Sequence, residues 1–312
     1  MSMRIRYSIP VYKICWLNHA KGGIIGTFYE PETKDELLEL CRGLYKDKKP
    51  FDIIGYTSNI YFLPSYNVEI MVSTRLVKEL IIEDDYLIVD CGVGVRTLAR
   101  QMVNEGIKGF EGLIDLPGTV AASVYGNASC YDCSINSLLL SIELLMPNGE
   151  VVVMMPEDLK LSKRSSALKR GELEGVVLSA KLRKLHGDVN ELMQLAEQNH
   201  QKRQATQPGP KDNLGSIYSV SGQLSIYGQF LHVLVFFYGC MLMITGRNKQ
   251  SVRLKKKDLL FRLLGARKMQ SYVYDWNRYI WKDEQAHEFF WTFHSIHKKM
   301  YKRSDFEIEI KG

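Results

Sequence analysis

The sequence predicts an α+β fold, and three observations carry this prediction. Apolar residues in 30–46 recur at the spacing of one helix face. Residues 51–54 form a short, mainly apolar run that is typical of a buried strand. An Asn-Gly pair separates two apolar stretches, 137–146 and 150–155, and Asn-Gly is the strongest short signal for a β-hairpin. Helices and strands are therefore mixed along the chain.

The remaining elements follow the same patterns in chain order. A tight turn at 55–59 separates the first buried strand from another at 60–63, and a glycine turn at 92–94 precedes a helix. Hydrophobic spacing further indicates strands at 86–90 and 176–185 and helices at 95–104, 258–264 and 281–301.

The chain is long enough for two or three sub-domains. It has 312 residues, of which 46% are hydrophobic, so it can bury a sizeable core. After residue 188 a polar helix leads into a linker that contains Pro and Gly, which indicates a domain boundary. We expect one domain over 1–188, with sub-domains of about 1–66 and 67–188, and a smaller domain, with the linker, over 189–312.

The charge balance is mildly basic, because 41 Lys and Arg residues stand against 35 Asp and Glu residues and give a net charge of +6. This surplus suits a small anionic substrate, although solvated surface charge explains it as well. We expect no nucleic-acid partner. The N-terminal residues lack the long apolar core of a signal peptide, which favours a cytoplasmic protein.

The cysteine and histidine patterns indicate no metal site. Six cysteines are too few for a disulfide scaffold at this length, and the lone CxxC of Cys130 and Cys133 lacks a second pair. It is either an incidental feature of a loop, which is the commoner case, or a redox pair. His287, His294 and His297 recur at helical spacing, but no carboxylate or cysteine completes a ligand set. We expect solvated or core-edge histidines.

Residues 229–246 are strongly apolar, and only His232 interrupts them. The stretch falls short of a comfortable transmembrane span of about 20 residues. Its β-branched and aromatic residues favour a buried β-hairpin that turns near Tyr238 and Gly239. Membrane contact is the less favoured alternative, so we expect no membrane partner.

The segment 107–133 is the most informative part of the chain, because a Leu-Pro-Gly-Thr-Val turn and two alanines precede an Asn-Ala-Ser loop. Pro and Gly force a sharp turn that points successive N–H groups one way. The segment closely resembles the flavin-contacting part of the UDP-N-acetylenolpyruvoylglucosamine reductases, which reads roughly GL-x-GLE-x-L-x-GIPGTVGG and then NAGAYG. The matching residues are Gly109, Gly112, Leu116, Pro117, Gly118, Thr119, Val120, Ala121, Ala122, Asn127, Ala128 and Tyr131.

Two upstream turns fit the same resemblance. The run Gly55, Tyr56, Thr57, Ser58 and Asn59 is similar to the family's flavin-pyrophosphate turn, usually Gly-Gly-Gly-Ser-Asn, and backbone N–H groups with the serine hydroxyl would hold phosphate oxygens there. Its second and third residues depart from glycine, and a β-branched residue tolerates a positive φ poorly.

The third turn, Gly92-Val-Gly94, corresponds to the family's next glycine turn. By this resemblance the cofactor-binding residues are 55–59, Gly92, Gly94, Pro117 to Ala122 and Asn127.

The resemblance also implies three catalytic residues. Arg164, in Lys-Arg-x-Ser, corresponds to the arginine that polarises the substrate carboxylate, and a guanidinium can bind a carboxylate through two donors. Ser216 takes the place of the proton-donating serine, although the Lys-Asn-Pro that normally follows is here Ser219-Val220-Ser221. Glu309 takes the place of the glutamate that acts with that serine. A solvated basic turn and an exposed edge strand are the alternatives for the arginine and the glutamate.

The resemblance implies a flavoenzyme with a two-part FAD-binding domain of the PCMH type and a smaller α/β substrate-binding domain. We expect FAD and NADPH as cofactors and NADPH-dependent reduction of UDP-N-acetylglucosamine enolpyruvate to UDP-N-acetylmuramate, a step of peptidoglycan synthesis in cell wall biogenesis. The alternative is a divergent FAD-binding relative that acts on another nucleotide-linked sugar, or a non-catalytic flavin-binding protein.

Overall fold

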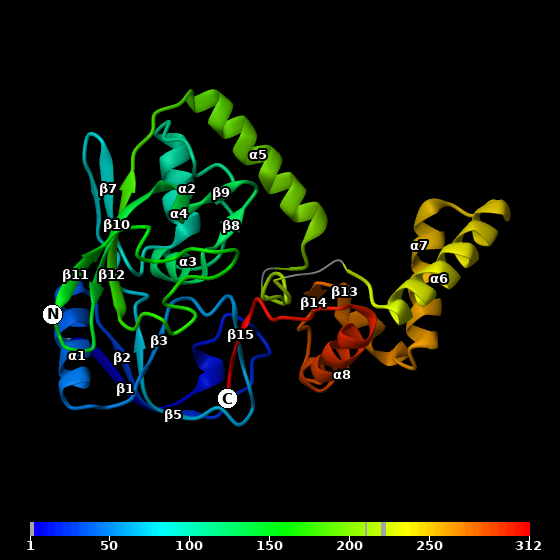
Figure 1. The fold of residues 1–312 in the computed structure, drawn as a ribbon, viewed down its shortest axis with the longest axis horizontal. Coiled ribbons are helices and arrows are strands. Elements are labelled where there is room, and N and C mark those ends of the chain that lie inside the picture. The colour runs from blue at the N-terminus through cyan, green and yellow to red at the C-terminus, as the bar shows by residue number, and fades with distance from the viewer. Residues whose placement is uncertain (1–2, 210, 220–222) are drawn as a thin grey trace. The chain divides into compact units, whose positions relative to one another are not determined.

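The structure, a computed structural model, describes residues 3–209, 211–219 and 223–312 (Figure 1). The chain forms two compact units. The first takes its residues from Met1–Trp16, Lys21–Thr206 and Ile310–Gly312, and the second from Leu17–Ala20 and Gln207–Glu309. The units divide after residue 206. The polar helix expected after residue 188 therefore belongs to the first unit, whereas the sequence places it in the domain of 189–312.

A four-stranded sheet forms one half of the first unit, in the order β1-β2-β5-β3. β1 is antiparallel to β2, while β2 and β3 both run parallel to β5. The helix α1 follows β2, and its N-cap Thr33 accepts a hydrogen bond from the Glu36 N–H. The bounds are β1 Arg4–Pro10, β2 Ile24–Glu30, α1 Lys34–Lys46, β3 Asp52–Ile54 and β5 Val68–Ser73.

A five-stranded antiparallel sheet, in the order β11-β10-β12-β7-β6, forms the other half. The predicted Asn-Gly hairpin is confirmed as the β10–β11 pair. Helices pack on this sheet around the largest hydrophobic core of the unit (Figure 1). The bounds are β6 Leu80–Ile82, β7 Tyr86–Asp90, α2 Val95–Asn104, α3 Val120–Gly126, α4 Ile135–Leu138, β10 Leu139–Leu145, β11 Val151–Met154, β12 Val176–Arg183 and α5 Val189–Thr206.

Two small strand pairs complete the first unit. β8 pairs with β9 across the CxxC, and β4 pairs with β15, the last strand of the chain. Within this unit the Leu63 N–H donates to the Lys311 carbonyl at 2.7 Å. The bounds are β4 Ile60–Phe62, β8 Ser129–Cys130, β9 Cys133–Ser134 and β15 Glu309–Lys311.

The second unit is mainly helical and has an aromatic core, in which Trp281, Tyr279, Phe290 and Phe293 are fully buried. Tyr218 stacks on His297 with ring centroids 3.7 Å apart. The helix predicted at 281–301 is confirmed as α8, but it begins at Gln285. The bounds are α6 Ile226–Ile244, α7 Lys249–Leu263, η2 Arg267–Tyr272, β13 Val273–Asp275, β14 Arg278–Tyr279 and α8 Gln285–Met300.

The prediction of a buried β-hairpin at 229–246 is wrong, because this stretch lies in the continuous helix α6. Its N-cap Ser225 accepts a hydrogen bond from the Gly228 N–H at 3.0 Å. The apolar run is longer than an ordinary strand and contains no Pro or Asn at which a hairpin could turn. Its length favours a helix, although its composition favours strands. Many of its apolar side chains are also exposed rather than buried.

Candidate functional site

The turns at 55–59 and 117–119 lie against each other in the first unit. A Cβ added at Gly55 would lie 2.7 Å from Thr119 Oγ1, and one added at Gly118 would lie 3.5 Å from Ser58 Oγ. Gly118 has a φ of 124°, a backbone conformation that favours glycine. The first of these contacts leaves no room for a side chain, which explains the glycine at position 55.

The third glycine turn joins the same surface. Gly94 and Thr119 form an antiparallel bridge, and the Val95 N–H donates to the Gly118 carbonyl at 3.0 Å. A Cβ added at Gly94 would lie 3.1 Å from the Tyr56 ring. Residues from all three predicted turns are therefore adjacent in space.

Backbone N–H groups on this surface are available to an anion. The N–H groups of Tyr56, Thr57, Ser58, Gly118 and Thr119 donate no hydrogen bond to any residue that the structure describes. Neighbouring free N–H groups of this kind make an anion-binding concavity. The residues present therefore fit the pyrophosphate of a dinucleotide cofactor.

Thr57 adopts a backbone conformation that glycine accepts more readily than other residues. Its φ is 57°, in the left-handed region, and its side chain is 4% exposed. The Thr57 Oγ1 accepts a hydrogen bond from the Trp16 N–H at 2.8 Å, which offsets part of the strain. A β-branched residue is therefore accommodated in the left-handed conformation at this turn.

Arg75 supports the same turn, and sequence reasoning missed it. Its guanidinium donates to the Gly55 carbonyl at 2.8 Å and to the Ile14 carbonyl. Burial lowers the pKa of Arg75. No motif marks this residue, because its role depends on two carbonyls that are distant in sequence.

The start of α3 and Gly92 make close contacts within the first unit, and their predicted contact with the cofactor stays a prediction. The Val120 and Ala121 N–H groups donate to the carbonyls of Val93 and Cys91, and the Ala122 N–H donates to the Thr119 Oγ1. The Val120 side chain is fully buried in the core. A Cβ added at Gly92 would lie 1.8 Å from the Thr74 carbonyl oxygen, so this glycine is required by backbone packing.

The turn that carries Arg164 is tied to the C-terminal end of α3. Ser162 and Ser165 exchange backbone hydrogen bonds of 2.9 and 3.0 Å, which leaves Arg164 at the tip with a φ of 57°. The Asn127 side-chain amide donates to the Ser162 carbonyl at 2.7 Å. The Ser166 hydroxyl donates to the Tyr125 carbonyl at 2.7 Å. Two hydrogen bonds therefore link the Arg164 turn to the helix that follows the Pro-Gly-Thr turn.

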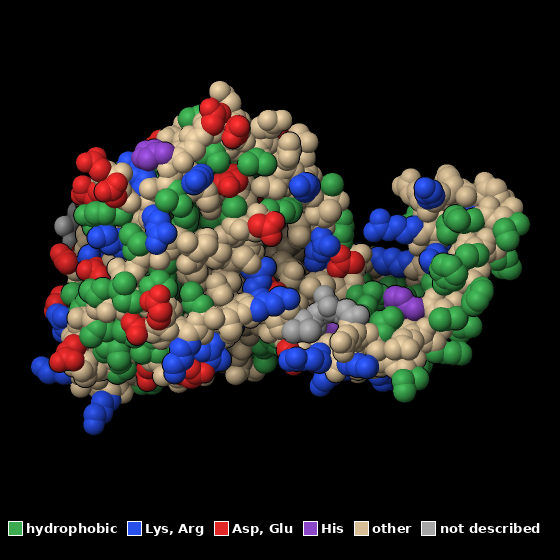
Figure 2. Space-filling model, turned by 45° about the horizontal axis from the view of Figure 1, so that its top comes forward, with side chains coloured by type: hydrophobic (Ala, Val, Ile, Leu, Met, Phe, Trp, Pro, Cys, Tyr) green, Lys and Arg blue, Asp and Glu red, His purple; other side chains and the backbone are tan. Residues whose placement is uncertain are grey.

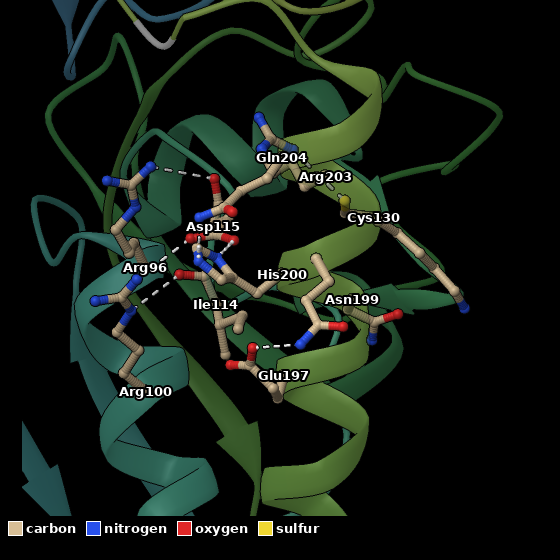
Figure 3. A network of polar contacts seen from close by, with 12 residues as sticks. Arg96, Arg100, Ile114, Asp115, Cys130, Glu197, Asn199, His200, Arg203 and Gln204 are labelled. Atoms are coloured by element: carbon tan, nitrogen blue, oxygen red, sulfur yellow. Dashed lines mark hydrogen bonds and ion pairs between the residues drawn. The ribbon is translucent and has the colours of Figure 1, made fainter.

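A polar network around Asp115 holds α5 against the rest of the first unit (Figure 3). The Asp115 carboxylate contacts His200 of α5 at 2.6 Å and Arg100 of α2 at 3.3 Å. Burial by itself raises the pKa of Asp115, but the hydrogen bond and charge of His200, with the charges of Arg96 and Arg100, lower it overall. These contacts explain why α5 belongs to this unit, and no sequence pattern indicated them.

Ser216 and Glu309 lie on neighbouring segments of the second unit. The pair Tyr218 and Phe306 forms an antiparallel bridge, and the Glu307 N–H donates to the Ile217 carbonyl at 2.8 Å. Val220 and Ser221, which replace part of the family's Lys-Asn-Pro, lie outside the described residues.

The cysteines and histidines have local partners. Cys130 and Cys133 are free thiols on β8 and β9, and burial raises the pKa of both. His287 contacts the His19 carbonyl, whereas His294 contacts the Tyr218 hydroxyl at 3.2 Å. Among the described residues, no group of three or more metal-ligating side chains gathers at one point.

Comparisons with known proteins agree with this geometry. Residues 27–154 match a family model described as an FAD binding domain. The chain is 30% identical over 199 residues to the UDP-N-acetylenolpyruvoylglucosamine reductase of Prochlorococcus marinus, a match that covers 63% of this chain and 68% of the relative. It is 26% identical over 197 residues to the Caldanaerobacter subterraneus reductase of that name, where the match covers 63% of this chain and 65% of the relative, slightly under two thirds.

A solved structure has the same fold over the whole chain. The UDP-N-acetylenolpyruvylglucosamine reductase from Thermus caldophilus matches with a TM-score of 0.68 and 18% identity, covering 100% of both chains. The predicted α+β fold of the FAD-binding type is thus confirmed. With the extent of the Prochlorococcus match, these findings show that the chain belongs to the UDP-N-acetylenolpyruvoylglucosamine reductase family.

Proposed function

We propose that the protein is an FAD-dependent reductase that uses NADPH to convert UDP-N-acetylglucosamine enolpyruvate to UDP-N-acetylmuramate. The observation that carries this proposal is that the three turns 55–59, 92–94 and 117–119 adjoin in a chain of this family, and that the N–H groups of Tyr56 to Ser58, Gly118 and Thr119 have no acceptor among the described residues. Bound FAD would supply the hydride-transfer chemistry. We further propose that the protein works in the cytoplasm.

The residues of the chain have separate parts in this proposal. The N–H groups of Tyr56 to Ser58, with Gly118 and Thr119, bind the pyrophosphate of the cofactor. Arg164 binds and polarises the carboxylate of the enolpyruvyl group through two donors. Ser216 delivers a proton to C2 of this group after C3 has received hydride, and Glu309 acts with it.

The rival reading, a flavin-binding relative with an altered reaction, rests on departures from the family pattern. One departure, Thr57 in place of glycine, is weaker support for this reading, because Thr57 adopts the left-handed conformation that favours glycine. The relatives that match here carry the reductase name. The reductase is therefore the function that the site supports best.

Two measurements test the proposal on the purified full-length protein. We expect the visible absorption of oxidised flavin. The colour should leave the protein on acid precipitation, since the proposal is that FAD binds non-covalently. NADPH should bleach this absorption, and UDP-N-acetylglucosamine enolpyruvate should restore it without oxygen. Colourless protein that does not bind added FAD would refute the proposal. Bleaching that the enolpyruvyl substrate does not reverse would favour the altered flavoenzyme.

A further inference from the structure

The helix α6 presents a continuous apolar surface in the second unit. Figure 2 shows hydrophobic side chains gathered over the end of the unit that α6 and α7 form. Phe230, Phe236 and Phe237 are 60%, 58% and 65% exposed. The other exposed apolar residues of α6 are Ile226, Tyr227, Val233, Leu234, Met241, Met243 and Ile244. Contiguous exposed apolar surface of this extent marks an interaction site.

The opposite face of α6 is fixed to its own unit. Its buried residues, Gly228, Leu231, Val235, Gly239 and Leu242, recur at helical spacing and form one stripe. A Cβ added at Gly228 would lie 2.1 Å from the Met300 carbonyl oxygen, and one added at Gly239 would lie 2.7 Å from Lys256 Cδ. The helix is therefore packed closely along one side, which leaves the remaining faces open.

Cationic side chains lie in the loop after this apolar helix and along the start of α7, which packs beside it. Residues 223–257 contain no Asp or Glu, but the loop after α6 and the first part of α7 hold Arg247, Lys249, Arg253, Lys255, Lys256 and Lys257. The first four of these are exposed. Lys256 lies with its Nζ 5.9 Å from the Phe236 ring centroid, so cationic and apolar side chains adjoin.

This combination fits an anionic lipid surface better than a second copy of the chain. Among the described residues, α6 is the helix long and apolar enough to cross a membrane by length and composition. A two-fold contact between copies would bring the same cations together across the interface. Acyl chains can take the aromatic face, while lipid phosphates attract the cations. Because α6 is packed along one side, it would lie in the interface rather than span it.

We propose that the α6–α7 hairpin docks the protein on the surface of an anionic phospholipid bilayer. The exposed face of α6 enters the boundary between headgroups and acyl chains, and the exposed cations Arg247, Lys249, Arg253 and Lys255 contact lipid phosphates. This attachment is independent of the reductase reaction, because α6 carries none of the residues assigned to it.

Co-sedimentation of the full-length protein with vesicles tests the proposal. We expect binding to vesicles of phosphatidylglycerol and phosphatidylcholine in equal parts, and much weaker binding to phosphatidylcholine alone. Phe230→Ser with Phe237→Ser should lower the partition coefficient at least about tenfold, because each removes a large apolar side chain from the lipid. Arg253→Gln and Lys255→Gln should each lower it about fivefold, and added salt should do the same.

The matched control is Val153→Ser on β11, which removes a 67% exposed apolar residue of the first unit and should leave vesicle binding unchanged. Circular dichroism melting checks that each variant is folded, and the two glutamine variants test the same surface if the serine pair does not fold. Equal binding of wild type and the α6 and α7 variants would overturn the proposal. So would failure to bind anionic vesicles combined with self-association, by sedimentation velocity, that the phenylalanine substitutions abolish.

Discussion

Asn127 and Ser162 are joined by a 2.7 Å hydrogen bond from the asparagine amide to the serine carbonyl, which ties the end of α3 to the turn that carries Arg164. Asn127 has a φ of 45°, so Asn127→Gly keeps the left-handed helix end while it removes this bond and the 3.0 Å bond that Asn127 Oδ1 accepts from the Asn136 amide. We expect bound flavin to remain and kcat to fall roughly threefold to tenfold, the value of the one hydrogen bond that reaches the Arg164 turn. Asn148→Gly, in the exposed hairpin turn, is the control. Loss of flavin without a change in kcat of the reconstituted protein would contradict this role.

Arg164→Lys should reduce turnover nearly as much as Arg164→Ala, because a lysine cannot supply the planar pair of donors that a carboxylate accepts. Steady-state oxidation of NADPH measures the effect. The exposed neighbour Lys163 provides the control, since Lys163→Ala removes a cation from the same turn and should change kcat little. Wild-type turnover in the Arg164→Lys variant would show that the guanidinium does not bind the substrate carboxylate through two donors.

Ser216→Ala and Glu309→Gln should affect only the second half-reaction. Reduction of the flavin by NADPH requires no proton donor to a substrate carbon, so its rate should not change. Reoxidation by the enolpyruvyl substrate should slow by about 10²–10⁴-fold, the usual contribution of a positioned acid. Stopped-flow absorbance separates the two steps. Normal reoxidation in both variants would remove these residues from the mechanism.

Thr57→Val should destabilise the first unit by about 1–3 kcal/mol, because the Trp16 N–H loses its acceptor while a β-branched residue still occupies the strained conformation. Thr57→Ser keeps the hydroxyl and should cost less than about 1 kcal/mol. Urea unfolding followed by flavin release or circular dichroism gives both values. Equal destabilisation by the two substitutions would show that the hydrogen bond does not hold this turn.

Stability should fall as the pH falls from about 6.5 toward 4. Burial and the charge of His294 lower the pKa of His297 to about 4, so the unfolded chain binds a proton in this window that the folded unit does not. The stabilisation is complete above the unfolded pKa, and it amounts to roughly 3 kcal/mol at most. His297→Gln should flatten the pH dependence measured by urea unfolding at several pH values. An unchanged slope in that variant would assign the effect to other groups.

The sequence predicts those parts of the fold and site that depend on local chemistry. The hairpin at the Asn-Gly pair, the strand at 86–90 and the helix at 95–104 are where their patterns place them. The three glycine turns occur in the same order as in the family that they resemble, and they are adjacent in the structure. A shared order of motifs implies a shared fold, and the fold brings the turns together. The role of each residue there stays a prediction.

Features that depend on packing could not be predicted in this way. The motif does not reveal that Val120 is fully buried in the core or that Gly92 lies against the Thr74 carbonyl, whereas their predicted contact with the cofactor stays a prediction. Arg75 and the Asp115 network join segments far apart in the chain. The prediction for the α6 stretch failed because composition favours strands, whereas its length and its packing against Met300 and Lys256 favour a helix.

The last residues of the chain, Ile310–Gly312, belong to the first unit, although Gln207–Glu309 belong to the second. In sequence, the second unit is thus an insertion near the end of the first. During synthesis, Leu63 cannot form its hydrogen bond to Lys311 until the whole insertion has been made. The first unit can therefore be completed only in chains that have been translated past Glu309. A chain that terminates before this residue lacks both Glu309, the proposed catalytic residue, and β15, the strand that pairs with β4.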